Sequence, residues 1–143
     1  MSELTTEYQV DELESNGMVP GELQTGHLLQ PIIAIVEEVK AAANEVVRTS
    51  REEHTARADE RLKRAYAERR IIREAGGDEK ALGSNEDARK RAFIIGLADD
   101  EIYMEARTAL ETATDNHELA TTRLENAQLD YDVALMRAGL WRA

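Results

Sequence analysis

Apolar residues recur every three or four positions from Ile32 to Val47, which is the spacing of one buried stripe along an α-helix. Pro31 precedes the stripe, and proline suits the first position of a helix. Beyond Val47 the same spacing passes through small or polar residues and then resumes: Ser50, His54, Ala58, Leu62, Ala65, Tyr66, Arg69 and Ile72. Because no Gly or Pro lies between Ile32 and Ala75, we expect a first helix over about residues 31–75.

A second helix is predicted over about residues 85–141, after a loop at residues 76–84 that contains Gly76, Gly77 and Gly83. Ser84 with Asp87 resembles a helix N-cap. Around residues 96–100 a glycine and two aspartates predict a kink, or the end of one helix and the cap of another. The second stripe then takes steps of three and four that alternate almost strictly. It runs through Ile102, Ala106, Ala109, Ala113, His117, Ala120, Leu124, Ala127, Tyr131, Ala134, Ala138 and Trp141.

These patterns predict an all-α protein built as a long antiparallel helical hairpin, or coiled coil. Residues 48–73 hold nine bases and five acids, whereas residues 99–132 hold two bases and ten acids, so the two limbs have complementary charge. An alanine-rich seam buries little area per residue. We therefore expect the hairpin to self-associate, most simply as a dimer that forms a four-helix bundle.

The first 26 residues have a different character from the rest of the chain. They hold six acids, no lysine or arginine, three glycines and no long apolar period. We therefore expect an acidic, largely disordered tail over residues 1–26 and a helical hairpin over residues 27–143.

Composition narrows the classes of function. The 143 residues have a formal net charge of −11, which disfavours loose binding to nucleic acid or to an anionic membrane. There is no cysteine, and no run of apolar residues is long enough to span a bilayer. A soluble protein of the cytoplasm is the expectation.

Candidate chemistry is sparse. The three histidines, His27, His54 and His117, have no second histidine at ligand spacing, and His117 fits a polar layer that fixes the register of the helices. No motif for catalysis, a metal or a cofactor is present, so we expect a protein that is not an enzyme and needs no cofactor.

Two charged surfaces are candidates for contacts with partners. Basic residues concentrate at the predicted hairpin tip, where acids interleave with them at helical spacing. The bases that could meet nucleic acid are Arg61, Arg64, Arg69, Arg70, Arg89, Lys90 and Arg91. The acids Glu111, Asp115 and Glu118 are the candidates for contact with a basic protein surface.

Residues 84–140 begin with a polar cap and the segment Asn85-Glu86-Asp87-Ala88-Arg89-Lys90 and continue as an Ala/Leu-rich coiled coil. This stretch resembles small helical-hairpin proteins of bacteriophages, from early gene regions for replication and recombination. By analogy with host-nuclease inhibitors of the Gam type, the resemblance implies a dimer of long helices with acidic surface and no catalytic residues.

The expected function is that of a non-enzymatic, oligomeric, phage-derived protein that contacts nucleic-acid-processing machinery as an inhibitor or adaptor. A recombination accessory that binds DNA or RNA through the basic tip is the first alternative. A structural spacer of a virion or tail is the second.

Overall fold

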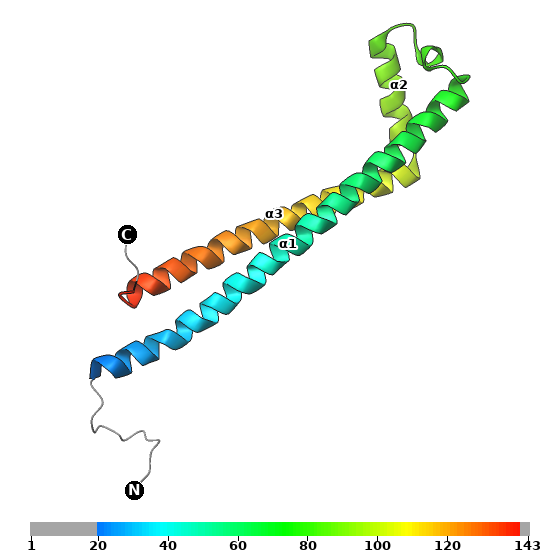
Figure 1. Cartoon of the computed structure of the whole chain (residues 1–143). Helices are drawn as coiled ribbons and strands as arrows, with labels where there is room; N and C mark the ends of the chain where they lie inside the picture. The colour runs from blue at the N-terminus through cyan, green and yellow to red at the C-terminus, as the bar shows by residue number, and fades with distance from the viewer. Residues whose placement is uncertain (1–19, 141–143) are drawn as a thin grey trace. The chain divides into compact units, whose positions relative to one another are not determined.

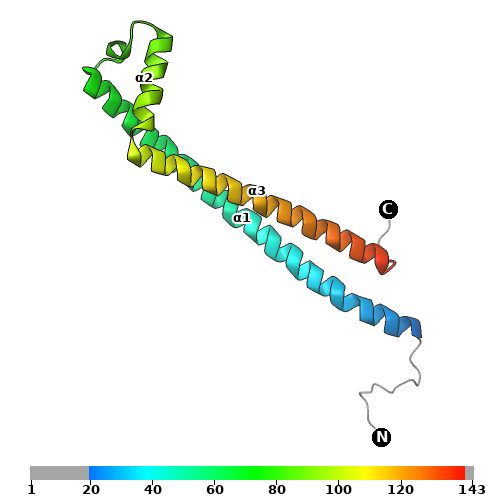
Figure 2. The same cartoon turned by 180° about the vertical axis from the view of Figure 1, so that it is seen from behind.

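A computed structural model describes residues 20–140, with side chains from Leu29 onward. It contains α1 (Pro20–Ala75), a 3-10 turn η2 (Glu79–Leu82), α2 (Glu86–Ala98) and α3 (Glu101–Arg137), as Figures 1 and 2 show. No strand occurs in this described range, which confirms the all-α class.

The chain divides into two compact units. Unit 1 is Met1–Ala42 together with Leu124–Ala143, and unit 2 is Ala43–Arg123. Each unit therefore contains a part of α1 and a part of α3, and unit 2 also contains η2 and α2.

The start of the first helix differs from the prediction. Because α1 begins at Pro20, residues 20–26 are helical and do not belong to a disordered tail. Pro31 lies inside the helix, where it lacks the N–H that would bond to the carbonyl of His27, rather than at its first position. Pro20 and the acidic Glu22 are residue types that suit the N-terminus of a helix. The one hydrogen bond that is missing at Pro31 does not end the helix. Residues 1–19 of the predicted tail lie outside the described range.

Glycines end both long helices. At the end of α1 the N–H of Gly77 donates to the carbonyl of Ile72 at 2.9 Å, and Gly76 and Gly77 have φ values of 128° and 89°. After α3 the N–H of Leu140 donates to the carbonyl of Leu135 at 2.9 Å, with Gly139 at φ 71°. Both are Schellman-type ends, which require a positive φ that glycine adopts at little cost. The predicted turn at Gly76 and Gly77 is confirmed, and α3 ends at Arg137, short of residue 141.

The predicted second helix is two helices. The side chain of Asn85, one residue beyond the predicted cap Ser84, accepts the N–H of Ala88 at 2.9 Å and begins α2. After α2 ends, Asp100 Oδ1 accepts the N–H of Tyr103 at 2.9 Å and caps α3. Of the two outcomes foreseen for residues 96–100, a break with a new cap is the one observed. The side chain of Asp100 accepts an N–H that has no partner within α3, and the N–H of Asp100 itself donates to the carbonyl of Leu97 at 3.1 Å.

In unit 2, α1 and α3 run antiparallel, because Thr49 meets His117 whereas Arg70 meets Asp100. On α3 the predicted seam is right at Ala106, Ala113 and Ala120, which are buried, and wrong at Ile102 and Ala109, which are exposed.

On α1 the predicted seam of unit 2 is wrong over most of its length, since Leu62 and Tyr66 are 47% and 54% exposed. Of the predicted residues, Ser50 and Ile72 are half-buried. The buried residues are Thr49, Ala67 and Ile71. The true seam passes through polar residues that bond across to α3, and a pattern of apolar residues alone cannot show this.

The described part of unit 1 consists of two helix segments, without a third helix. This part has one buried side chain, Ile32, and places the segment Pro31–Glu38 of α1 beside Asp130–Arg137 of α3. Val36 and Val39 lie beside Tyr131 on another side of the same pair.

Candidate functional site

Three helices meet at one end of unit 2, which we call the corner. Its core consists of four buried residues, Ala67 and Ile71 from α1, Leu97 from α2 and Tyr103 from α3. Leu82, Phe93 and Met104 pack against them. Each helix therefore contributes apolar area that it could not bury alone, and this fixes the positions of the polar groups around the corner.

Gly96 allows α2 to approach α1 closely. A Cβ atom at this position would lie 2.6 Å from Cδ1 and 2.8 Å from Cγ1 of Ile71, distances that no packed carbon tolerates. The glycine in the predicted kink region therefore serves helix packing, since α2 continues through it to Ala98.

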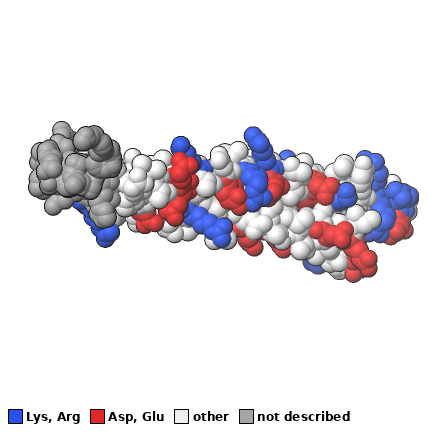
Figure 3. Space-filling view, turned by 90° about the horizontal axis from the view of Figure 1, so that it is seen from below, with Lys and Arg blue, Asp and Glu red and all other residues white. Residues whose placement is uncertain are grey.

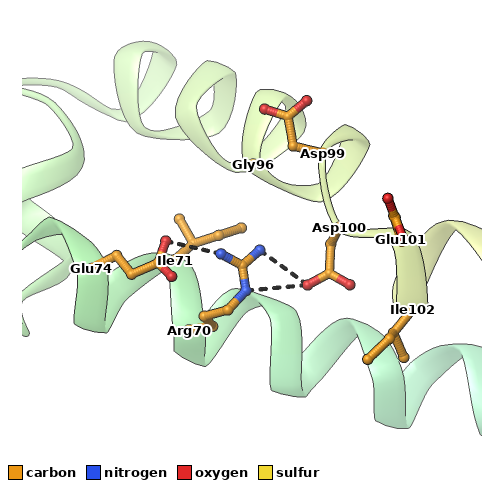
Figure 4. Close-up of a pocket in the computed structure, with 8 residues that line it drawn as sticks. All are labelled: Arg70, Ile71, Glu74, Gly96, Asp99, Asp100, Glu101 and Ile102. Atoms are coloured by element: carbon orange, nitrogen blue, oxygen red, sulfur yellow. Dashed lines mark hydrogen bonds and ion pairs between the residues drawn. The ribbon is translucent and has the colours of Figure 1, made fainter.

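An ion pair ties the start of α3 to α1. Nε and Nη2 of Arg70 donate to Asp100 Oδ2 at 3.3 and 3.0 Å, and Nη1 donates to Glu74 at 2.9 Å. Figure 4 shows Arg70 between these two carboxylates, with Ile71 between α1 and Gly96. The hydrogen bond from the N–H of Tyr103, together with Arg70, holds the pKa of Asp100 below its ordinary value despite burial. Asp100 thus caps α3 and anchors it at the same time.

A groove of about 500 Å³ opens on the corner, and we call it the corner groove. Its apolar lining comes from α2 and α3, and its charged lining comes from α1 and α3. The lining residues are Glu60, Arg64, Ile94, Leu97, Ala98, Tyr103, Met104, Arg107, Leu110 and Glu111. Ile94 is 66% exposed, which leaves a large apolar side chain in water. Burial raises the pKa of Tyr103, and the neighbouring Glu60 raises it further, so this phenol stays protonated at neutral pH.

The predicted acidic residues lie next to this groove. Glu111, Asp115 and Glu118 are exposed and follow one face of α3 at spacings of four and three. Glu111 belongs to the groove lining and lies 3.5 Å from Arg107. Within residues 29–140, Asp115 and Glu118 have no ion pair, so their carboxylates face solvent.

The predicted basic residues are mostly engaged. Arg64 pairs with Glu68 at 3.1 Å and Lys90 with Glu86 at 3.7 Å, and Arg70 holds Asp100 and Glu74.

Arg89 donates to the carbonyl of Gly83 at 3.2 Å. Arg61, Arg69 and Arg91 are exposed and have no ion pair with any described side chain. On the face drawn in Figure 3, Lys and Arg side chains are interspersed with Asp and Glu.

A polar layer crosses the seam of unit 2 where His117 was expected to provide one. Thr49, which is 1% exposed, donates to the carbonyl of Glu45 at 2.8 Å and lies 3.1 Å from Nδ1 of His117. The tautomer of His117 decides whether Nδ1 or the hydroxyl is the donor in this contact. One turn away, Thr114 donates to Glu53 at 3.0 Å, which lowers the pKa of Glu53.

Sequence reasoning missed the corner groove, Gly96 as a contact, and Asp100 as an anchor. The pair Asp99-Asp100 ahead of a helical pattern was a usable signal for a cap, but its partner Arg70 lies thirty residues earlier. No local pattern connects them.

The side chains from Leu29 to Leu140 include no group of three or more His, Asp or Glu residues arranged to hold a metal ion. None of the described helices is long and apolar enough to cross a membrane. The sequence matches no protein-family model, and comparisons with curated proteins and with solved structures found no match.

Proposed function

We propose that this protein is not an enzyme and acts by protein–protein contact on nucleic-acid-processing machinery, as an inhibitor or adaptor. The observation that carries the proposal is the corner groove, whose apolar floor lies beside the acidic row of Glu111, Asp115 and Glu118. Such a surface suits a partner helix with apolar anchors and basic residues along one flank. The proposal includes self-association of the chain.

The charge distribution supports a protein partner over nucleic acid. The net charge of −11 opposes approach to phosphates, and Arg64, Arg70 and Lys90 already pair with acids of the chain. Arg61, Arg69 and Arg91 remain exposed without an ion pair to a described residue. These three arginines are the observation that favours the alternative of an accessory protein that binds DNA or RNA.

The groove is tested by capturing partners from a bacterial lysate on the immobilised full chain. Ile94→Glu places a charge in the groove and is expected to reduce the captured partner at least about tenfold. Ile95→Glu is the matched control, since Ile95 is the next residue of α2, is 64% exposed and does not line the groove. Equal loss in both variants, or in neither, contradicts the assignment of the groove.

The acidic row is tested by the variant with Glu111→Lys, Asp115→Lys and Glu118→Lys. It is expected to slow association with the captured partner, and Glu105→Lys, on a different face of α3, is expected to leave the rate unchanged.

The alternative is tested with duplex and single-stranded DNA at about 150 mM salt, where we expect no measurable binding. Salt-dependent binding that is lost on replacing Arg61, Arg69 and Arg91 by glutamine would favour the nucleic-acid function. This variant spares Arg70, whose loss would disturb the corner.

A further inference from the structure

The described residues of unit 1 leave an apolar face uncovered by one another. A hollow of about 540 Å³, which we call the unit 1 hollow, lies along its two helices. Its floor is apolar and its rim is charged: Pro31, Ile32, Ile35, Val133 and Ala134 form the floor, and Glu38, Asp130 and Arg137 form the rim. On α3, Leu129 and Met136 are 61% and 58% exposed. An exposed apolar floor with a charged rim is typical of an interaction surface.

The residues that α3 contributes to the unit 1 hollow have a spacing that is the same in both directions along the helix. They are Asp130, Val133, Ala134 and Arg137, so the steps between them are three, one and three in either direction. An antiparallel copy of the same helix therefore sets Val133 of one copy against Ala134 of the other. The small Ala134 side chain allows the two helices to approach closely.

The same register brings opposite charges together. Asp130 and Arg137 are seven residues apart, about 10.5 Å along the helix, which is too far for them to pair within one chain. Neither has an ion pair among the described residues. In an antiparallel dimer each Asp130 meets Arg137 of the other copy, whereas a parallel pairing would set Asp130 against Asp130. The two-fold symmetry makes both ion pairs at once.

We propose that the unit 1 hollow is occupied by α3 of a second copy of this chain, antiparallel and related by a two-fold axis between Val133 and Ala134. The proposal deepens the self-association in the proposed function by naming its surface and its register. The unit 1 hollow shares no residue with the corner groove, so partner binding at the corner groove can be tested independently of the dimer.

A charge swap tests the register, with the dimer dissociation constant of the full chain measured by sedimentation equilibrium. Asp130→Arg and Arg137→Asp are each expected to raise it at least about tenfold, because like charges then meet twice in every dimer. The double variant Asp130→Arg with Arg137→Asp restores opposite charges and is expected to return it to within about threefold of the original. Asp132→Arg, on a different flank of α3, is the matched control and is expected to have little effect. Circular dichroism at 222 nm checks that each variant remains helical.

A crosslink tests the axis. The chain has no cysteine, so Ala134→Cys gives one thiol beside the proposed axis, and mild oxidation is expected to produce a disulfide-linked dimer. Asn126→Cys, on the same helix, would lie about 20 Å from its copy along the axis and is expected to stay uncrosslinked.

A monomeric wild type contradicts both the self-association and this surface. If the wild type is a dimer but the two single charge reversals leave its dissociation constant unchanged, the proposed surface alone is contradicted. The same holds if the double variant does not restore the dissociation constant. Equal crosslinking at residues 126 and 134 contradicts the register.

Discussion

Unit 1 and unit 2 contain parts of the same two long helices, but different interactions hold each pair together. Unit 2 adds a third helix, a buried cluster around Leu97 and Tyr103, the Arg70–Asp100 ion pair and the polar layer at His117. The described part of unit 1 has one buried side chain, Ile32, and no ion pair or side-chain hydrogen bond between its two helices.

The difference shows what two helices lack on their own. A seam of alanines and small residues buries little apolar area, and α2 supplies the missing area in unit 2. Unit 1 has no such third helix within its described residues and leaves Leu129 and Met136 in water. We propose that unit 2 is stable through its own contacts, whereas a second copy of the chain stabilises unit 1.

The largest effect is expected from the cluster of unit 2. Leu97→Ala removes a side chain that is 7% exposed and should lower the free energy of unfolding by about 3 kcal/mol, measured by urea denaturation. Ile94→Ala, on the same helix but exposed, should change it by less than about 0.5 kcal/mol. If the two variants behave alike, the corner is not the stabilising core.

The close contact of α1 and α2 gives the next effect. Gly96→Val places two methyl groups where Ile71 already lies and should lower the free energy of unfolding by about 2 kcal/mol. Ala98→Val, exposed in the same helix, controls for the lower helix propensity of valine and should cost well below about 1 kcal/mol. A neutral Gly96→Val would mean that the helices separate at little cost.

The polar layer at His117 should contribute less to the free energy of unfolding than the buried cluster of unit 2 does. Thr49→Val keeps the shape of the side chain but removes the hydroxyl that meets His117, and should lower the free energy of unfolding by about 1 kcal/mol. Thr55→Val, exposed on α1, is expected to be neutral in the same urea titration. A more stable Thr49→Val would show that the layer serves register alone.

The smallest effect concerns pH. The pKa of Asp100 is lowered in the folded protein, so its contribution to stability is present above about pH 4, the unfolded value, and is lost as pH falls through the folded pKa. Asp100→Asn keeps a good helix cap but removes the titrating charge, so the acid-induced loss of stability should become smaller. Asp99→Asn is the control, and urea titrations between about pH 2 and pH 7 make the comparison. If the free energy of unfolding of Asp100→Asn falls with pH as steeply as that of the original protein, the anchoring role of Asp100 is contradicted.

The sequence predicted the parts of this fold that depend on local signals. Helical periodicity, the glycines at Gly76 and Gly77, and the aspartates after α2 are local, and they placed the helices and the turn. The seam of α1 in unit 2 was mispredicted because Thr49 and Glu53 are acceptable there only through His117 and Thr114, more than sixty residues away.

The candidate site depended even more on distant contacts. Glu111 could be proposed from charge alone, but its groove exists only because α2 turns back onto Ile71 beside Gly96. Likewise Arg70 was predicted as a candidate for nucleic-acid contact, and the structure uses it to hold Asp100.

Hydrogen exchange of the full chain, followed by mass spectrometry at concentrations below and above the dimer dissociation constant, shows whether unit 1 is stable alone or is stabilised by a second copy. We expect amides of unit 2 to be equally protected at every concentration. Amides of residues 29–42 and 124–137 should gain protection as the dimer forms, and Arg137→Asp should abolish that gain. The proposed dimer is contradicted if amides of unit 1 are as protected in the monomer as those of unit 2. It is also contradicted if the protection of unit 1 does not change on dimerisation.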